Sequence, residues 1–187
     1  MQIEKTAVEG VLIITPRVFR DARGFFYESY NQEQLLAHGV ETAFVQDNHS
    51  RSAKGTVRGL HFQLPPAAQV KLLRVVAGAV WDVAVDIRVG SPTFGRWVGV
   101  ELSADNFRQL LIPAGFAHGF CVLSEVAEVL YKASHVYRPD LERSIHWRDP
   151  QLGVQWPVDE PVLSDRDARA GSLADYLAAT PFVFGSA

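Results

Sequence analysis

Short apolar runs, separated by glycines, prolines and polar turns, make up most of the sequence. The clearest pattern lies between residues 71 and 88, where Gly78 divides two apolar runs. In the second run, large apolar residues from Trp81 to Ile87 alternate with small or polar ones, which is typical of a strand with two different faces. Similar runs predict further strands at residues 11–14, 25–27, 57–62, 97–102, 109–112, 119–123 and 128–132.

Many short strands with few helical segments predict an all-β barrel or sandwich. We expect one helix after Asn31, which can cap it, and a second over Ser172–Ala179. Beyond about Arg138 the pattern is irregular, and we expect this part to wrap the barrel. A length of 187 residues with 48% hydrophobic content suits one domain, so residues 1–187 are predicted to form a single unit whose mouth holds one small ligand.

The charge pattern narrows the classes of partner. Charged residues make up 21% of the chain and the formal net charge is −3, which argues against nucleic acid and acidic membranes as partners. No stretch reaches the length of a membrane span, and the start MQIEKTAVEG has no signal-peptide pattern, so we expect a cytoplasmic protein. Cys121 is the only cysteine and stands in an apolar run, which predicts a buried core residue and excludes a cysteine-based zinc site within one chain.

The densest group of polar side chains lies at residues 56–63 and 69–72. Strict alternation along a strand puts Arg58 on one face and His61 on the other. A single histidine on a strand is more often structural than functional. The nearness in sequence of Arg58 and Lys71 favours a functional role for His61.

The segment Ile112–Phe120 resembles the turn-and-histidine motif of cupin barrels, with His118 as the histidine. Metal-binding cupins combine this residue with a His-x-His pair and a carboxylate. That pair is missing, because Phe62 and Gln63 follow His61. We therefore expect a cupin-like barrel without a metal, in which His118 is free to bind a ligand phosphate.

Two further segments leave alternatives open. Tyr131 and Tyr137 can be core aromatic residues with their hydroxyls at the surface, or a proton donor and a stacking platform. The segment Leu163–Asp167 is a polar turn to which the residue types alone assign no role.

Six long segments stand in order along nearly the whole chain: Asp21–Asn31, Phe44–Ser50, Arg58–Gln63, Ser91–Gly95, Gly115–Phe120 and Leu163–Asp167. Together they resemble the motifs of the dTDP-4-dehydrorhamnose 3,5-epimerase family. The resemblance implies an all-β jelly-roll barrel of the cupin type with a few short flanking helices, usually a homodimer, that binds a dTDP-sugar.

The resemblance also implies roles for individual residues. It makes His61 the base, Asp167 the carboxylate that orients it, Tyr131 the acid and Lys71 the group that stabilises the enolate oxygen. Tyr137 would stack on the thymine. The implied contacts to nucleotide, diphosphate or sugar are Arg23, Glu28, Gln46, Asp47, Asn48, Arg58, His118, Glu142 and Arg166.

Four positions depart from the residues common in this family: Val70, Leu111, Arg148 and Arg166. None of them is the implied base, acid or orienting carboxylate, so the implied reaction class is unaffected. The first two bear on the expected shape of the sugar pocket.

The expected activity is inversion at C3 and C5 of a 4-keto-6-deoxy sugar nucleotide on the way to dTDP-L-rhamnose. No cofactor is expected, because the proton leaves and returns at the same oxidation level. One alternative is a relative that inverts only C3 or only C5. Others are a non-catalytic sugar-nucleotide-binding cupin, which the joint presence of the four implied catalytic residues disfavours, and a metal-dependent cupin enzyme.

Overall fold

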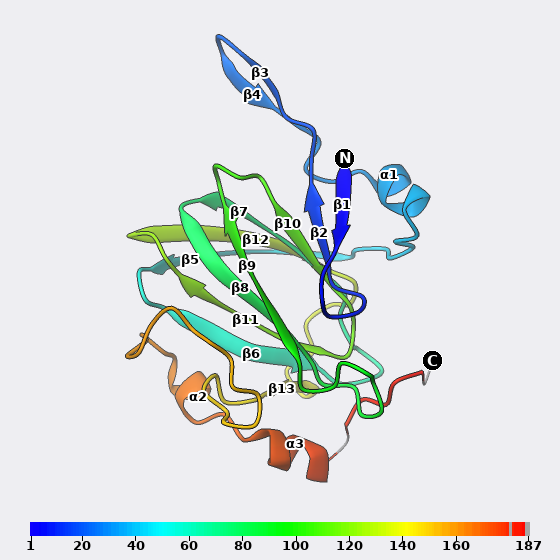
Figure 1. The fold of residues 1–187 in the computed structure, drawn as a ribbon, viewed down its shortest axis with the longest axis vertical. Helices are drawn as coiled ribbons and strands as arrows, with labels where there is room; N and C mark the ends of the chain where they lie inside the picture. Colours follow the sequence, from blue (N-terminus) through cyan, green and yellow to red (C-terminus); the bar gives the residue numbers. More distant parts are fainter. Residues whose placement is uncertain (180, 186–187) are drawn as a thin grey trace.

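Two antiparallel sheets hold most strands of the computed structural model, which describes residues 1–179 and 181–185 (Figure 1). One has the order β1-β2-β10-β7-β12-β5 and the other β13-β6-β11-β8-β9. Strands far apart in sequence are neighbours in each sheet, as in jelly-roll barrels. The strands are β1 (Gln2–Lys5), β2 (Leu12–Thr15), β5 (Gln46–Ala53), β6 (Val57–Gln63), β7 (Lys71–Ala77), β8 (Ala79–Asp86), β9 (Trp97–Ser103), β10 (Gln109–Ile112), β11 (Phe116–Val122), β12 (Val126–Ala133) and β13 (Glu142–Ser144).

The space between the sheets is filled by an apolar core, to which Leu73 and Val75 of β7, Ala84 of β8 and Val129 of β12 contribute. Inward and outward residues alternate along regular strands such as β7 and β8, which is the period seen in the sequence. The all-β, cupin-type prediction is confirmed.

The outer face of the second sheet is also covered. Val83 and Val85 pack there against Ile145, Leu173 and other residues of the C-terminal part of the chain. Both faces of β8 are therefore buried, and this includes its polar residues. Asp82 and Asp86 are fully buried, so the polar side of the predicted strand lies inside the protein.

Three short helices flank the barrel: α1 (Gln32–Ala37), α2 (Asp165–Ala168) and α3 (Leu173–Ala178). Asn31 and Ser172 are the N-caps of α1 and α3, which confirms the two predicted helices. The predicted polar turn at residues 163–167 contains the start of α2. There the Ser164 hydroxyl accepts a hydrogen bond from the amide of Asp167.

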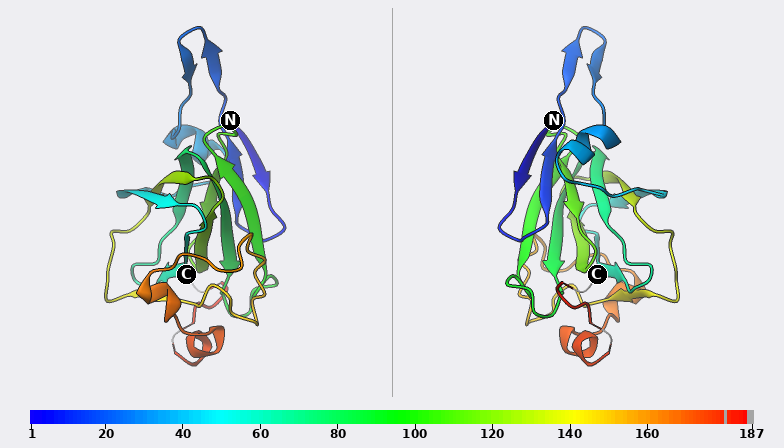
Figure 2. Two further views of the ribbon diagram at one scale, coloured as in Figure 1. Left: turned by 90° about the vertical axis from the view of Figure 1, so that its left-hand side faces the viewer. Right: turned by 90° about the vertical axis from the view of Figure 1, so that its right-hand side faces the viewer.

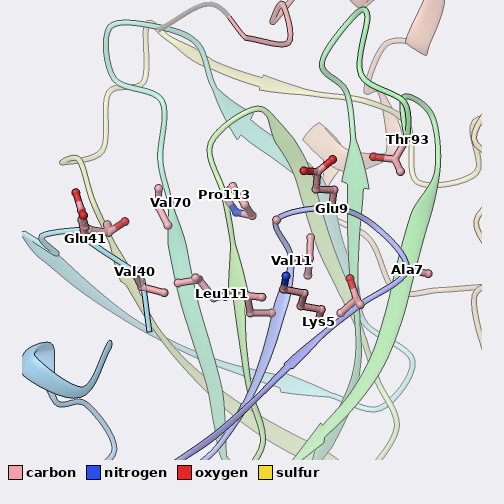
Figure 3. A pocket seen from close by; sticks show the side chains of 15 residues that line it. Lys5, Ala7, Glu9, Val11, Val40, Glu41, Val70, Thr93, Leu111 and Pro113 are labelled. Carbon is pink, nitrogen blue, oxygen red and sulfur yellow. The ribbon is translucent and has the colours of Figure 1, made fainter. Parts of the chain in front are cut away.

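The outer face of the six-stranded sheet carries a third apolar cluster, built around Ile14, Leu35, Leu72 and Leu111. A pocket on this face is lined by Val40, Val70 and Leu111 among others, as Figure 3 shows.

A hairpin of β3 (Phe19–Asp21) and β4 (Gly24–Phe26) projects away from the barrel in all views (Figure 2). Its aromatic side chains are largely exposed, with 50% of Phe19, 57% of Phe25 and 67% of Phe26 accessible. Within the part of the chain that the structure describes, no helix is long and apolar enough to span a membrane.

Candidate active site

The pairing of β6 with β11 decides which side chains of β6 enter the barrel. His61 lies opposite His118, but Arg58 lies opposite Phe120, so the register shifts between them. Such a shift places one extra residue in β6, a β-bulge. The side chains of Arg58 and His61 therefore share the inner face. The predicted placement of Arg58 and His61 on opposite faces is wrong, because strict alternation ignores this bulge.

Close backbone approach accompanies this bulge. A side-chain carbon added to Gly59 would lie 2.5 Å from the Cα of Gly119 on β11. Gly59 also has φ of 140°, which favours glycine. Glycine at this position lets the two strands approach where the histidine enters the barrel.

His61 is paired with Asp167, which stands 106 residues later in the sequence. Its Nε2 lies 2.5 Å from Oδ1 of Asp167, whose side chain is almost fully buried. Burial alone raises the pKa of Asp167, but hydrogen bonds from His61 and Ser164 and the charge of Arg166 hold this pKa below its usual value. With Nε2 bonded to the carboxylate, Nδ1 of His61 is the ring nitrogen left to accept a proton.

Lys71 begins β7 and lies opposite Ala133 of β12, on the same face as the core residue Leu73. Burial lowers the pKa of Lys71 to about 8, although the negative charges of Glu142 and Asp82 act in the other direction. The ammonium is thus still the main form near pH 7. It brings a positive charge into the apolar interior.

Tyr131 lies opposite Leu73 on one side and Asn48 on the other, and it packs against the inner core. Burial and the charge of Glu142 raise its pKa, while Arg58 lowers it, so the phenol keeps its proton at neutral pH. Tyr137 is different, since 47% of it is exposed and its hydroxyl donates to Glu142. Of the two candidate phenols, Tyr131 is the one inside the barrel.

A polar network links Tyr137 to the histidine. The carboxylate of Glu142 accepts a hydrogen bond from the Tyr137 hydroxyl at 2.5 Å and pairs with the guanidinium of Arg166. Nη2 of Arg166 lies 3.2 Å from Nε2 of His61. The side-chain carbonyl of Gln46 accepts from the amide of Tyr137 at 2.8 Å.

The network extends to β5, the strand at one edge of the six-stranded sheet. The side-chain amide of Gln46 donates to Asn48, and both residues share the face of β5 on which Tyr131 lies opposite Asn48. Arg58 lines a cavity of about 610 Å³ together with His61, Arg166 and Asp167. These predicted site residues are therefore brought together at one end of the barrel.

His118 forms a second histidine-carboxylate pair, with Asp82. Its Nε2 lies 3.0 Å and 3.1 Å from the two carboxylate oxygens of Asp82. Burial lowers the pKa of His118 in spite of this carboxylate. Nε2 of His118 is thus engaged by Asp82, and Nδ1 is the ring nitrogen left for the predicted contact with a ligand phosphate. Asp82 was missed, although a charged residue on one face of an otherwise apolar strand is a usable signal.

Three predicted binding residues lie elsewhere in this chain. Asp47 pairs with Lys132 at 2.9 Å on the face of β5 opposite to Asn48. Glu28 accepts hydrogen bonds from Asn31 and Gln34 beside α1.

Arg23 pairs with Asp21 at 2.5 Å in the projecting hairpin, and 90% of its side chain is exposed. Hydrogen bonds between neighbouring residues of the hairpin hold it there.

Two of the departures from the family pattern also lie away from this site. Val70 and Leu111 pack in the outer apolar cluster and line the pocket of Figure 3. They face away from the inner surface that carries Lys71 and His61, because neighbouring residues of a strand point to opposite faces. Their side chains therefore lie on the outer face of this sheet and not on the inner surface where the sugar pocket is expected.

Among the residues that the structure describes, no group of three or more His, Cys, Asp and Glu side chains could hold an ion.

The barrel interior receives a carboxylate-bound histidine together with a partly buried lysine and a partly buried phenol, which are side chains of the types that proton transfer on a bound ligand uses. The profile of the family described as dTDP-4-dehydrorhamnose 3,5-epimerase matches residues 5–175. The chain belongs to this family.

Individual relatives agree over almost the whole chain. It is 56% identical to the dTDP-4-dehydrorhamnose 3,5-epimerase of Shigella flexneri over 94% of this chain and 97% of that protein. Among solved structures it resembles dTDP-6-deoxy-D-glucose-3,5-epimerase of Legionella pneumophila Philadelphia 1 in complex with dTDP-4-keto-L-rhamnose, at 50% identity, TM-score 0.95 and 99% coverage of both chains. A more distant relative is the dTDP-4-dehydrorhamnose 3-epimerase of Streptomyces niveus, 41% identical over 94% of this chain and 85% of that protein.

We expect Lys71 to titrate near pH 8 in the ligand-free protein, as measured by NMR of its side-chain carbons. Asp82→Asn should lower this pKa further, by about one unit, because it removes a negative charge that favours the ammonium. Asp47→Asn is the matched control, since Asp47 faces Lys132 on the other side of β5. An unchanged Lys71 pKa in Asp82→Asn would contradict the inferred effect of the Asp82 charge on Lys71.

Proposed function

We propose that this chain inverts C3 and C5 of dTDP-4-dehydro-6-deoxy-D-glucose and yields dTDP-4-dehydro-L-rhamnose, a step in dTDP-L-rhamnose biosynthesis. The chain is an isomerase by its family, and residues 1–187 act as one epimerase domain. The observation that carries the mechanism is the contact of His61 with Asp167 at the interior that also receives Lys71 and Tyr131.

The ketone at C4 makes the protons on C3 and C5 acidic. Nδ1 of His61 removes such a proton, and Asp167 stabilises the imidazolium that forms. General acid-base catalysis of this kind contributes roughly two to four powers of ten in rate. Lys71 stabilises the negative charge that develops on the C4 oxygen. Loss of one such donor typically costs about 2.7 to 4 kcal/mol of transition-state stabilisation.

Inversion requires that the new proton arrive on the opposite face of the sugar. Tyr131 is the donor in this proposal, because its phenol is half-buried and protonated at neutral pH. The proton leaves and returns without a change in oxidation level, so the reaction needs neither a redox cofactor nor a metal.

The substrate carries a diphosphate, which needs positive charge in a protein of formal net charge −3. Arg58 and Arg166 line the cavity beside His61 and can offer paired hydrogen bonds to phosphate oxygens. Nδ1 of His118 is a further contact. Exposed Tyr137 stacks on the thymine, and Gln46, Asn48 and Glu142 complete the contacts to the ligand.

A homodimer accounts for Arg23 and Glu28. The hairpin of β3 and β4 projects from the barrel (Figures 1 and 2) with exposed Phe25 and Phe26, and none of its residues lines the His61 cavity of its own chain. In a dimer with two-fold symmetry each hairpin can reach the site of the other chain. Arg23 would then bind the diphosphate held by the partner. Asp47 would contact the ligand only after leaving Lys132, with which it pairs in this chain. The enzyme is expected to act in the cytoplasm, with the dTDP-sugar as its ligand.

Inversion at C3 alone is the second candidate. The 3-epimerase of Streptomyces niveus favours it, because the chain is similar to that enzyme over most of its length. NMR of the sugar product formed in heavy water separates the two, since deuterium and inverted configuration are read at each carbon. Deuterium and inversion at C3 only would replace the 3,5-epimerase by the 3-epimerase. A nucleotide sugar that binds but never exchanges would indicate a non-catalytic binding protein.

His61→Ala should abolish deuterium uptake at both C3 and C5 while nucleotide binding stays measurable, because the base acts on both protons and the phosphates are held by other groups. Asp167→Asn should fold but lose about two to four powers of ten in kcat, since it changes the tautomer and the charge beside the ring. Substantial exchange by the His61→Ala protein would remove His61 from the role of base. Full activity of Asp167→Asn would show that the pairing of Asp167 with His61 is not needed for catalysis.

Tyr131→Phe should still exchange substrate protons for deuterium, because His61 can remove and return a proton on one face. It should yield much less inverted product. Tyr137→Phe is the matched control, since the stacking ring remains. The measured quantity is the ratio of deuterium exchange to inverted sugar. Wild-type inversion in Tyr131→Phe together with its loss in Tyr137→Phe would assign the acid to Tyr137.

Mixed dimers test whether Arg23 acts across the subunit boundary. Arg23→Ala and His61→Ala proteins should each be strongly impaired, and co-expressed chains should regain activity. A mixed dimer has one site with both His61 and the partner's Arg23, so random pairing restores about one quarter of the sites. Absence of any recovery, in dimers shown to be mixed, would contradict the exchange of hairpins.

A further inference from the structure

Arg166 contacts His61 itself as well as Glu142, in addition to lining the cavity in which we place the diphosphate. Its guanidinium pairs with both carboxylate oxygens of Glu142. Its Nη2 also lies 3.2 Å from Nε2 of His61. Ser164 and the first turn of α2 bring Arg166 and Asp167 to the same nitrogen.

The nitrogen cannot bond to both neighbours at once. Nε2 of His61 lies 2.5 Å from Asp167, and an imidazole nitrogen is either a donor or an acceptor. A guanidinium only donates. Because the pKa of Asp167 is held below its usual value, the carboxylate is ionised and takes the hydrogen of Nε2. Arg166 is then a positive charge against the ring edge and not a hydrogen-bond partner.

The charges around His61 come from every element packed against it. Negative groups favour the imidazolium and positive groups disfavour it. The two groups in contact with the ring, Asp167 and Arg166, have opposite signs. Glu142 of β13 and His118 of β11 also interact with the ring electrostatically, and Arg58 of β6 lines the same cavity. Asp82 of β8 and Lys71 of β7 act on His118, and the phenol of Tyr131 interacts with Glu142 and Arg58.

We propose that Arg166, held in place by Glu142, is a positioning residue whose positive charge at the ring edge disfavours the imidazolium and so keeps His61 available as a base. The inference rests on the proposed role of His61. A histidine bonded to a buried carboxylate tends to keep its proton, and an imidazolium cannot remove a proton from the sugar. The guanidinium opposes this tendency, while Asp167 still fixes the orientation of the ring.

The test is an NMR titration of the His61 ring in ligand-free protein, with the signal assigned from its loss in His61→Gln. Arg166→Met should raise the His61 pKa by about one unit, which is modest because half of the Arg166 side chain is exposed. Arg166→Lys keeps the positive charge and should restore most of the wild-type value. Glu142→Gln should move the pKa the other way, since it removes a negative charge and leaves Arg166.

Arg143→Met is the matched control. Arg143 stands next to Glu142 on β13, but it lies opposite Phe62 and donates to backbone carbonyls of Asp140 and Glu142. The Arg143→Met substitution removes one positive charge at a similar place in the chain, and it should leave the His61 pKa unchanged. An unchanged or lowered His61 pKa in Arg166→Met would overturn the inference, as would equal shifts in Arg166→Met and Arg143→Met.

The pH dependence of turnover gives a second reading. The acid limb of kcat/KM should move to higher pH in Arg166→Met, because a raised pKa means that the base is lost at higher pH. An acid limb at the wild-type position would count against the inference. Deuterium exchange by His61→Ala tests the base separately, so failure of the Arg166 inference leaves the role of His61 standing.

Discussion

The contact between the ring of His61 and the carboxylate of Asp167 joins the barrel to the C-terminal part of the chain. Asp167 is 3% exposed, and a buried carboxylate is costly unless it receives hydrogen bonds. It receives them from His61 and from the amide of the helix turn that Ser164 caps. The same contact orients the ring of the proposed base, so one pair of side chains satisfies the buried carboxylate and also fixes the histidine on which the proposed mechanism depends.

The barrel contains a second pair of the same type, and its surroundings give it a different character. The side chain of His118 is 9% exposed and Asp82 is fully buried, whereas 21% of the His61 side chain is accessible. Both pairs face the inner surface, since His61 and His118 are opposite each other on neighbouring strands. The more accessible histidine, His61, is the one placed to meet a ligand, as the proposed mechanism requires. His118 is better suited to hold the wall of the site and the charge of Lys71 in place.

Charge is arranged locally and not over the whole molecule. The protein has a small negative net charge, yet Lys71, Arg58 and Arg166 act at one end of the barrel. Glu142 forms an ion pair with Arg166, and the negative charge of Asp82 favours the ammonium form of Lys71. Neither cation is therefore without a nearby negative charge. This balance lets a site for an anionic ligand exist next to an apolar core without an uncompensated buried charge.

Much of the fold could be predicted from local pattern. The period-two runs located most strands, and Asn31 and Ser172 marked two helices, because pleat and cap geometry act over a few residues. Strand β5 was not predicted, because its polar sequence carries no apolar alternation. Its pairing with β12 along its whole length is visible only in the tertiary structure. The motifs in sequence order also pointed to the family and to His61, Tyr131, Lys71 and Asp167 as a set.

Tertiary structure alone decided how these residues meet. The bulge between β6 and β11 put Arg58 and His61 on one face, and no local period contains that information. The approach of α2 brought Asp167 and Arg166 to His61, and strand pairing turned Asn48 inward and Asp47 outward. Sequence pattern sets the direction of each side chain relative to its own strand, whereas register and packing between distant segments set which side chains become neighbours.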